Sequence, residues 1–105
     1  MKIAIVGMGY VGKAMDRFFS RCYETVPYDQ PLGVGLRRDV NECDCAVVCV
    51  PTPQAPDGSC DTSIVEEVVG WIETPLVIIK STVSPGTTDL LACTFHKPLI
   101  FSPEY

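Results

Sequence analysis

Short apolar runs recur along the chain, and most are apolar at nearly every position instead of at every second one. Strands buried on both faces of a parallel sheet have this pattern, because helices cover both of their sides. Strong runs lie at residues 2–6, 45–50, 75–81 and 98–101, and a weaker one lies at 24–28. The pattern predicts five strands.

Between these runs, apolar residues recur with the period of a helix. One stripe covers residues 11–22 and predicts an amphipathic helix with Cys22 on its apolar face. A second stripe covers residues 64–72, where Ser63 and Glu66 have the spacing of a capping box at a helix start.

A third helix is predicted to begin at Ser84, with Pro85 in its first turn. Strands that alternate with helices predict an α/β fold, here a Rossmann-like doubly wound parallel sheet with right-handed crossovers. A chain of 105 residues has room for one domain, so we expect residues 1–105 to form a single domain.

The segment after the second strand is short for this fold. Only residues 30–44 separate that strand from the next, which leaves no room for a helix, a further strand and a return helix. Pro27 cannot donate a hydrogen bond to a sheet ladder, so it favours an edge position. We therefore expect about five strands in the order 2-1-3-4-5, with residues 24–28 at the edge and the usual outer strand reduced or missing.

Composition and charge exclude several classes of protein. The chain is 47% apolar and 20% charged, with a net charge of −5. Beyond Arg37 and Arg38 it has no basic cluster that would bind nucleic acid, and no apolar run approaches the ~20 residues of a membrane helix. The six cysteines include no C-x-x-C pair, so we expect buried reduced thiols in a cytoplasmic protein and no metal site.

A glycine-rich loop joins the first strand to the first helix. Gly7, Gly9 and Gly12 form a G-x-G-x-x-G motif between an apolar strand and an amphipathic helix, which is the context that a dinucleotide site requires. The first glycine permits a tight turn, the second lets a pyrophosphate approach the backbone, and the third lets the helix pack on the strand. The unpaired N–H groups of the helix N-terminus favour phosphate binding.

An acidic residue stands where this fold binds the adenosine ribose. Asp29 follows Gly7 by 22 residues, at the end of the second strand, which is the position of the carboxylate that accepts from the ribose hydroxyls of NAD. Gln30 and Pro31 follow it, and neither supplies a positive charge for a 2′-phosphate. The sequence therefore favours NAD over NADP as the cofactor.

Two polar loops leave the carboxyl ends of later strands. Residues 51–63 contain three prolines and a Pro-Asp-Gly turn, and residues 80–89 contain several hydroxyl side chains, including Ser81 and Thr82. Ligands of open α/β sheets bind at this edge, so both loops are expected beside the glycine-rich loop.

Four motifs together resemble the amino-terminal domain of the UDP-glucose/GDP-mannose 6-dehydrogenase family. They are GMGYVG, VPTP with a following DGSCDTS, KSTVSPGTTD and FSPEY, and they occur in the family's order. Members of the family oxidise the 6-alcohol of a nucleotide sugar to a uronate with NAD. The resemblance implies that Thr82 and Glu104 order water and assist acid–base steps. It also implies an NAD cleft formed by residues beyond the glycines and Asp29: Tyr10, Val11, Thr52, Ser81 and Thr82.

The resemblance also indicates what this chain lacks. The family's nucleophilic cysteine, central helices and substrate-binding region have no counterpart here, so we expect an NAD-binding domain that is inactive alone. A nucleotide sugar is expected to bind only if further chain completes the site, and a homodimer is possible. One alternative is a stand-alone nucleotide-binding module without turnover. Another is a dehydrogenase of the 3-hydroxyacid or 6-phosphogluconate type, which VPTP and STVSPGTT disfavour.

Overall fold

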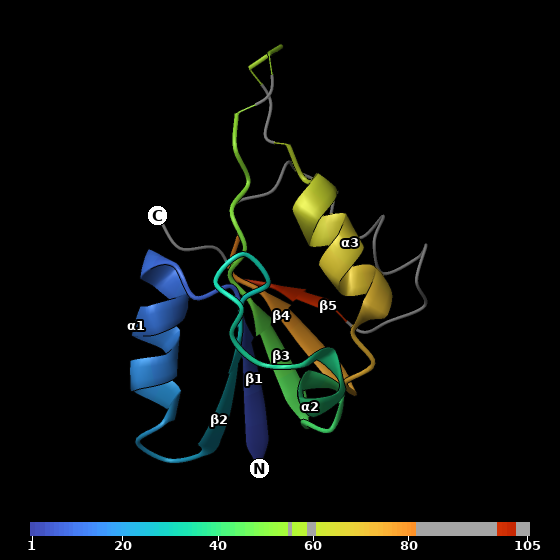
Figure 1. The fold of residues 1–105 in the computed structure, drawn as a ribbon. Coiled ribbons are helices and arrows are strands. Elements are labelled where there is room, and N and C mark those ends of the chain that lie inside the picture. Colours follow the sequence, from blue (N-terminus) through green and yellow to red (C-terminus); the bar gives the residue numbers. More distant parts are fainter. Residues whose placement is uncertain (55, 59–60, 82–98, 103–105) are drawn as a thin grey trace.

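The computed structural model describes residues 1–54, 56–58, 61–81 and 99–102, and within them a parallel sheet lies between two layers of helix (Figure 1). The strands are β1 (Lys2–Val6), β2 (Glu24–Tyr28), β3 (Cys45–Val48), β4 (Leu76–Ile79) and β5 (Leu99–Phe101). The helices are α1 (Tyr10–Phe19), α2 (Arg37–Asn41) and α3 (Ser63–Trp71).

The predicted sheet is confirmed in strand number, direction and order. All neighbouring strands are parallel, and the order is β2-β1-β3-β4-β5. Pro27 lies on the edge strand, opposite Ile5. Residues 30–42 are all described, and they hold α2 but no strand that extends the sheet.

The chain after β2 folds back on the strand end. Asp29 and Val34 exchange two backbone hydrogen bonds, each 2.9 Å long. Gly35 follows with a φ of +77°, and a Cβ at this position would overlap the carbonyl oxygen of Pro27. This tight return brings α2 against β1 and β2, where Val40 is fully buried.

Helices pack on both faces of the sheet. Figure 1 shows α1 on one side, with α2 and α3 on the other. Val65, Val68 and Val69 place the apolar side of α3 in the larger core cluster, and Met15 and Phe19 of α1 pack on the smaller cluster. None of the described helices is long and apolar enough to cross a membrane.

The first helix is shorter than the periodicity predicted. It ends at Phe19, and the amides of Cys22 and Tyr23 both donate to the carbonyl of Phe19 in a turn that leads into β2. Cys22 is therefore exposed and not on a helix face, so that prediction was wrong. The apolar period continued past the point where the chain must reverse to pair with β1.

The capping box predicted at the start of α3 is also wrong. Ser63 is the first residue of the helix, not its cap, and Thr62 makes no side-chain capping bond. The carboxylate of Asp61 accepts from the amide of Ser63 at 2.9 Å. This backbone hydrogen bond from Ser63, with one from its side chain, lowers the pKa of Asp61.

The four described cysteines are not all buried, as the sequence had predicted they would be. Cys43 and Cys45 are buried, Cys49 is partly buried and Cys22 is exposed. Burial raises the pKa of the Cys43 and Cys45 thiols. The described residues contain no cluster of ligand side chains that could hold a metal ion. The helix predicted from Ser84 lies outside the described residues.

Candidate functional site

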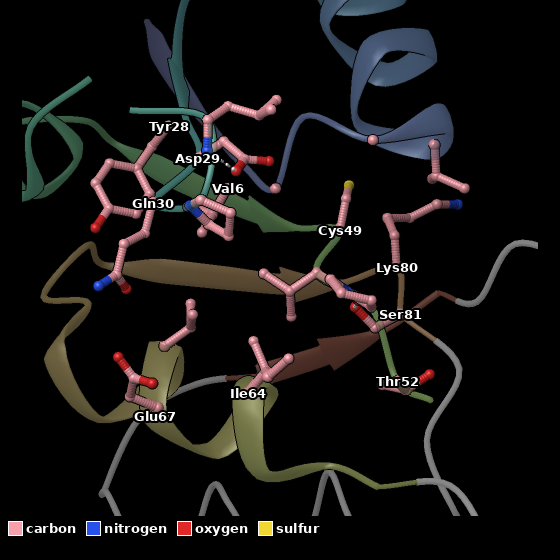
Figure 2. Close-up of a pocket in the computed structure, with 18 of the residues that line it drawn as sticks. Val6, Tyr28, Asp29, Gln30, Cys49, Thr52, Ile64, Glu67, Lys80 and Ser81 are labelled. Atoms are coloured by element: carbon pink, nitrogen blue, oxygen red, sulfur yellow. Dashed lines mark hydrogen bonds between the residues drawn. The ribbon is translucent and has the colours of Figure 1, made fainter. Parts of the chain in front are cut away.

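A cavity of about 670 Å³ opens at the carboxyl ends of the strands. Its wall is formed by the glycine-rich loop, the end of β2 with the residues that follow it, the loop after β3, one side of α3 and the end of β4. Figure 2 shows Tyr28 and Glu67 at one end of this cavity, with Thr52, Lys80 and Ser81 at the other. The sequence predicted a ligand site at this edge, and a cavity lies there.

Two of the motif glycines are required by packing against the protein itself. Gly7 has a φ of +95°, and a Cβ on it would lie 2.8 Å from backbone atoms of Cys49 and Val50. Its amide donates to the carbonyl of Tyr28 at 2.7 Å. A Cβ on Gly12 would overlap the carbonyl oxygen of Gly7. These contacts press the loop onto β2 and β3.

Gly9 is different, because its missing side chain leaves open space. A Cβ there would meet no heavy atom within 4 Å, and the residue lines the cavity. Gly9 is the N-cap of α1 and provides no side-chain cap, so no side chain of the cap residue satisfies the amides of the first turn. Such a terminus attracts anions through its N–H groups and the helix dipole. Tyr10 and Val11 of this first turn also line the cavity, and Tyr10 is 96% exposed.

Asp29 lies on the cavity wall and already holds two backbone groups. One carboxylate oxygen accepts from the amide of Met8 at 2.8 Å, and the other accepts from the amide of Leu32 at 3.1 Å. The carboxylate thus ties the glycine-rich loop to the loop after β2. Each carboxylate oxygen has a further lone pair, so both can still accept from a ribose hydroxyl.

Thr52 and Ser81 line the cavity as the sequence analysis expected. Ser81 is 7% exposed, and its hydroxyl donates to the carbonyl of Val50 at 2.6 Å. This hydrogen bond holds the end of β4 against the chain that leaves β3. Lys80 also lines the cavity, and its Nζ donates to the hydroxyl of Ser102 at 3.3 Å. Thr82 and Glu104, to which the resemblance assigns acid–base roles, lie outside the described residues.

The far end of the cavity contains residues that the sequence analysis did not identify. Tyr28 and Trp71 meet edge to face with ring centroids 5.1 Å apart, and both line the cavity with Glu67. Arg37 lies behind them, on α2. The apolar stripe of α3 was recognised from its period, but nothing local in the sequence places α2 beside it.

A parallel sheet with a glycine-rich loop and an open helix N-terminus beneath a cavity defines the dinucleotide-binding class of Rossmann-like domains. The model of one such family, described as the NAD binding domain of the UDP-glucose/GDP-mannose dehydrogenase family, matches residues 32–99 of this chain. The chain therefore belongs to this family, as its motifs indicated, and NAD is the cofactor of the domain.

Similar proteins and similar solved structures are also described as nucleotide-sugar dehydrogenases. The Bacillus subtilis protein YtcA, named as a UDP-glucose 6-dehydrogenase, is 27% identical over an alignment covering 88% of this chain and 30% of that protein. The UDP-D-ManNAc dehydrogenase of Pyrococcus horikoshii matches all of this chain and 36% of its own, with 25% identity and a TM-score of 0.83. A UDP-glucose dehydrogenase of Pyrobaculum islandicum matches 99% of this chain and 36% of its own, with 25% identity and a TM-score of 0.76.

The GDP-mannose dehydrogenase of Pseudomonas aeruginosa shares the fold at 23% identity and a TM-score of 0.78, and 36% of its chain is covered. The present chain thus spans about a third of the length of the relatives that it matches. It corresponds to their NAD-binding part.

Proposed function

We propose that this chain provides the NAD-binding domain of a nucleotide-sugar 6-dehydrogenase, with residues 1–105 acting as one domain. The observation that carries the proposal is Gly9, the one motif glycine with open space in front of it, at an uncapped helix N-terminus on the cavity wall. A pyrophosphate at this point would accept from the amides at the start of α1, with Tyr10 and Val11 beside it.

The adenosine half of the cofactor would lie toward Asp29. A ribose at this position donates its hydroxyls to the carboxylate, whose geometry is fixed by the amides of Met8 and Leu32. A 2′-phosphate would instead face this carboxylate at close range, and like charges repel most strongly where water is partly excluded. This charge repulsion supports the preference for NAD over NADP.

The nicotinamide half would then extend toward the ends of β3 and β4, where Thr52, Lys80 and Ser81 line the cavity. NAD supplies the hydride acceptor when it is bound. The chain's contribution at this end is to position the ring and, through Thr82 and Glu104 as the family resemblance implies, to order water and move protons near the sugar C6. The substrate class is a nucleotide sugar, bound when further chain completes the site.

The location and the partners of the protein belong to the same proposal. We propose a cytoplasmic protein with no nucleic-acid or membrane partner, since its charge is negative and none of its described helices is long and apolar enough to cross a membrane. A homodimer is proposed as the assembled form, which sedimentation at several concentrations tests directly.

Two measurements on the purified chain test the proposal. Isothermal titration calorimetry should detect binding of NAD, weaker binding of NADP, and NAD binding that is at least tenfold weaker when the helix N-terminus is blocked in Gly9→Ala. Absorbance at 340 nm should stay flat with NAD and UDP-glucose or GDP-mannose, because positioning of the sugar needs surface that these residues do not provide. Absence of NAD binding would reject the proposed function. Steady NADH formation would reject only the expected inactivity.

A further inference from the structure

Arg37 contacts three residues of the cavity wall without itself lining the cavity. Its guanidinium carbon lies 4.8 Å from the centre of the Trp71 ring, within the range of a cation–π contact. Its Nε donates to the hydroxyl of Tyr28 at 3.3 Å, and a terminal nitrogen donates to the carboxylate of Glu67 at 3.2 Å. Tyr28, Glu67 and Trp71 all line the cavity, whereas Arg37 is behind them.

The three wall residues come from two elements, and Arg37 contacts all of them. Glu67 and Trp71 are four residues apart on α3 and so face the same side of the helix, whereas Tyr28 ends β2. The planar guanidinium can stack on a ring and donate from its edge in the same position, which an ammonium cannot do. One side chain thereby fixes two rings and a carboxylate.

A second contact at the other end of α2 keeps Arg37 in place. The side-chain amide of Asn41 donates to the carbonyl of Trp71 at 3.2 Å and accepts from the amide of Glu73 at 2.8 Å. The short helix is therefore attached to α3 by both its first and its last residue. It cannot slide along α3 without breaking one of these contacts.

The wall that results suits a planar heteroaromatic base. Two aromatic side chains, together with Ile64 and Val68 of α3, give an apolar surface of the cavity. The Glu67 carboxylate at its edge accepts hydrogen bonds, as an exocyclic amino group requires. The Asp29 ribose position lies next to this wall, because Asp29 directly follows Tyr28.

We propose that Arg37 is a positioning residue for the adenosine half of the cofactor, because it holds Tyr28, Glu67 and Trp71 in the geometry that receives the adenine. The inference rests on the proposed binding of NAD in this cavity. Preorganised walls raise affinity because the ligand does not have to order them on binding. Loss of Arg37 should therefore weaken every ligand that contains adenosine and leave the nicotinamide half unaffected.

Trp71 is the only tryptophan of the chain, so its fluorescence reports on this wall alone. In the unmodified protein, AMP and ADP-ribose should change the Trp71 emission on binding. Arg37→Ala should raise the Kd of AMP, ADP-ribose and NAD about tenfold and by a similar factor for each. Arg37→Lys keeps the charge but not the planar stack, and it should recover only part of the affinity.

The matched control is Arg38→Ala, on the next position of α2. Arg38 has a side chain that is 79% exposed and pairs with Asp39, so its removal changes the net charge equally but should leave each Kd within twofold. Circular dichroism shows which variants are folded. If Arg37→Ala does not fold, the Kd values of Arg37→Lys test the role of Arg37 instead.

The outcomes separate this inference from the proposed function. If calorimetry detects NAD but Trp71 emission ignores AMP, or a folded Arg37 variant keeps its affinity for ADP-ribose, the role of Arg37 is rejected and NAD binding stands. If NAD itself does not bind, both are rejected. Equal weakening in the Arg37 and Arg38 variants would show a general charge effect and would also reject the inference.

Discussion

The two ends of the cavity are built in different ways. The glycine-rich loop, residues 7–12, forms its part of the wall from one continuous stretch of backbone. The far wall is formed by side chains from two elements, with Tyr28 on β2 and Trp71 on α3, and Arg37 on α2 contacts both from behind. The loop packs closely on its neighbours because its glycines have no side chains. The far wall has an apolar surface because large side chains form it.

This difference determines how each region responds to change. In the loop, Gly7 and Gly12 leave no room for a single added carbon, because the atoms that would be hit belong to the backbone and cannot rotate away. At the far wall a side chain can be shortened at a graded cost, because its neighbours keep some of their contacts.

Gly12→Ala should have the largest effect on stability. The new Cβ overlaps the carbonyl oxygen of Gly7, so α1 must move away from the strand that it follows. Overpacking against backbone should lower the free energy of unfolding by about 3 kcal/mol, with loss of NAD binding. Chemical denaturation monitored by circular dichroism measures this. An unchanged midpoint would show that the loop tolerates added atoms as well as the far wall does.

Gly9→Ala, in the same motif, should weaken NAD binding and leave the stability of the fold almost unchanged. Its Cβ meets no heavy atom of the protein, so the free energy of unfolding should change by less than about 0.5 kcal/mol. The methyl group would occupy the space in front of the helix N-terminus, and the Kd for NAD should rise tenfold or more, about 1.4 kcal/mol. Calorimetry at matched temperature is the measurement. If Gly9→Ala lost stability as well as NAD affinity, the view that Gly9 serves binding and not packing would be wrong.

Asp29→Asn should lower both the stability of the fold and the affinity for NAD by a moderate amount. The amide retains one acceptor oxygen, so one of the two bonds to Met8 and Leu32 is lost, at a cost of about 1 kcal/mol in stability. NAD should bind more weakly, and its advantage over NADP should narrow because the negative charge is removed. Thermal unfolding and parallel titrations with the two cofactors test this. A variant that binds NAD as before would remove Asp29 from the site.

The smallest effect concerns the thiols. Burial raises the pKa of Cys43 and Cys45 in the folded protein, so each stays protonated at a pH where it ionises in the unfolded chain. This contribution to stability is complete below the ordinary thiol pKa of 9.0 and is lost as the pH rises through the folded value. The denaturant concentration at the unfolding midpoint should therefore decrease as the pH is raised above 9. The decrease should be smaller in Cys45→Ala.

A map of thiol modification gives a second measure of the same burial. Cys22 is exposed and should react with an alkylating reagent before Cys43 and Cys45 do, as peptide mass analysis would show. The predicted burial of Cys22 failed because the helical period continues to it in the sequence, whereas the helix stops at Phe19. The return to β2 required a turn there, and an apolar period contains no information about where a chain must reverse.

The same limit explains why Ser63 is not the N-cap of α3 and its own amide donates to Asp61. Several oxygens near a helix start can each accept that bond, and the approach of the preceding loop selects among them. The edge position of β2 was predicted correctly, because Pro27 and the short segment after it act locally. A proline lacks its N–H in any fold, and a chain of fixed length cannot span more than its residues allow.

What the sequence determined by itself is whatever depends on neighbours along the chain. The strands, their parallel order and the glycine-rich loop follow from apolar runs, chain length and the absence of side chains at Gly7, Gly9 and Gly12. The tertiary structure alone decided that Arg37 lies over Trp71 and beside Tyr28, since these contacts join elements whose local patterns carry no record of one another. Backbone constraints act over a few residues, but side-chain contacts between elements exist only after the sheet has brought them together.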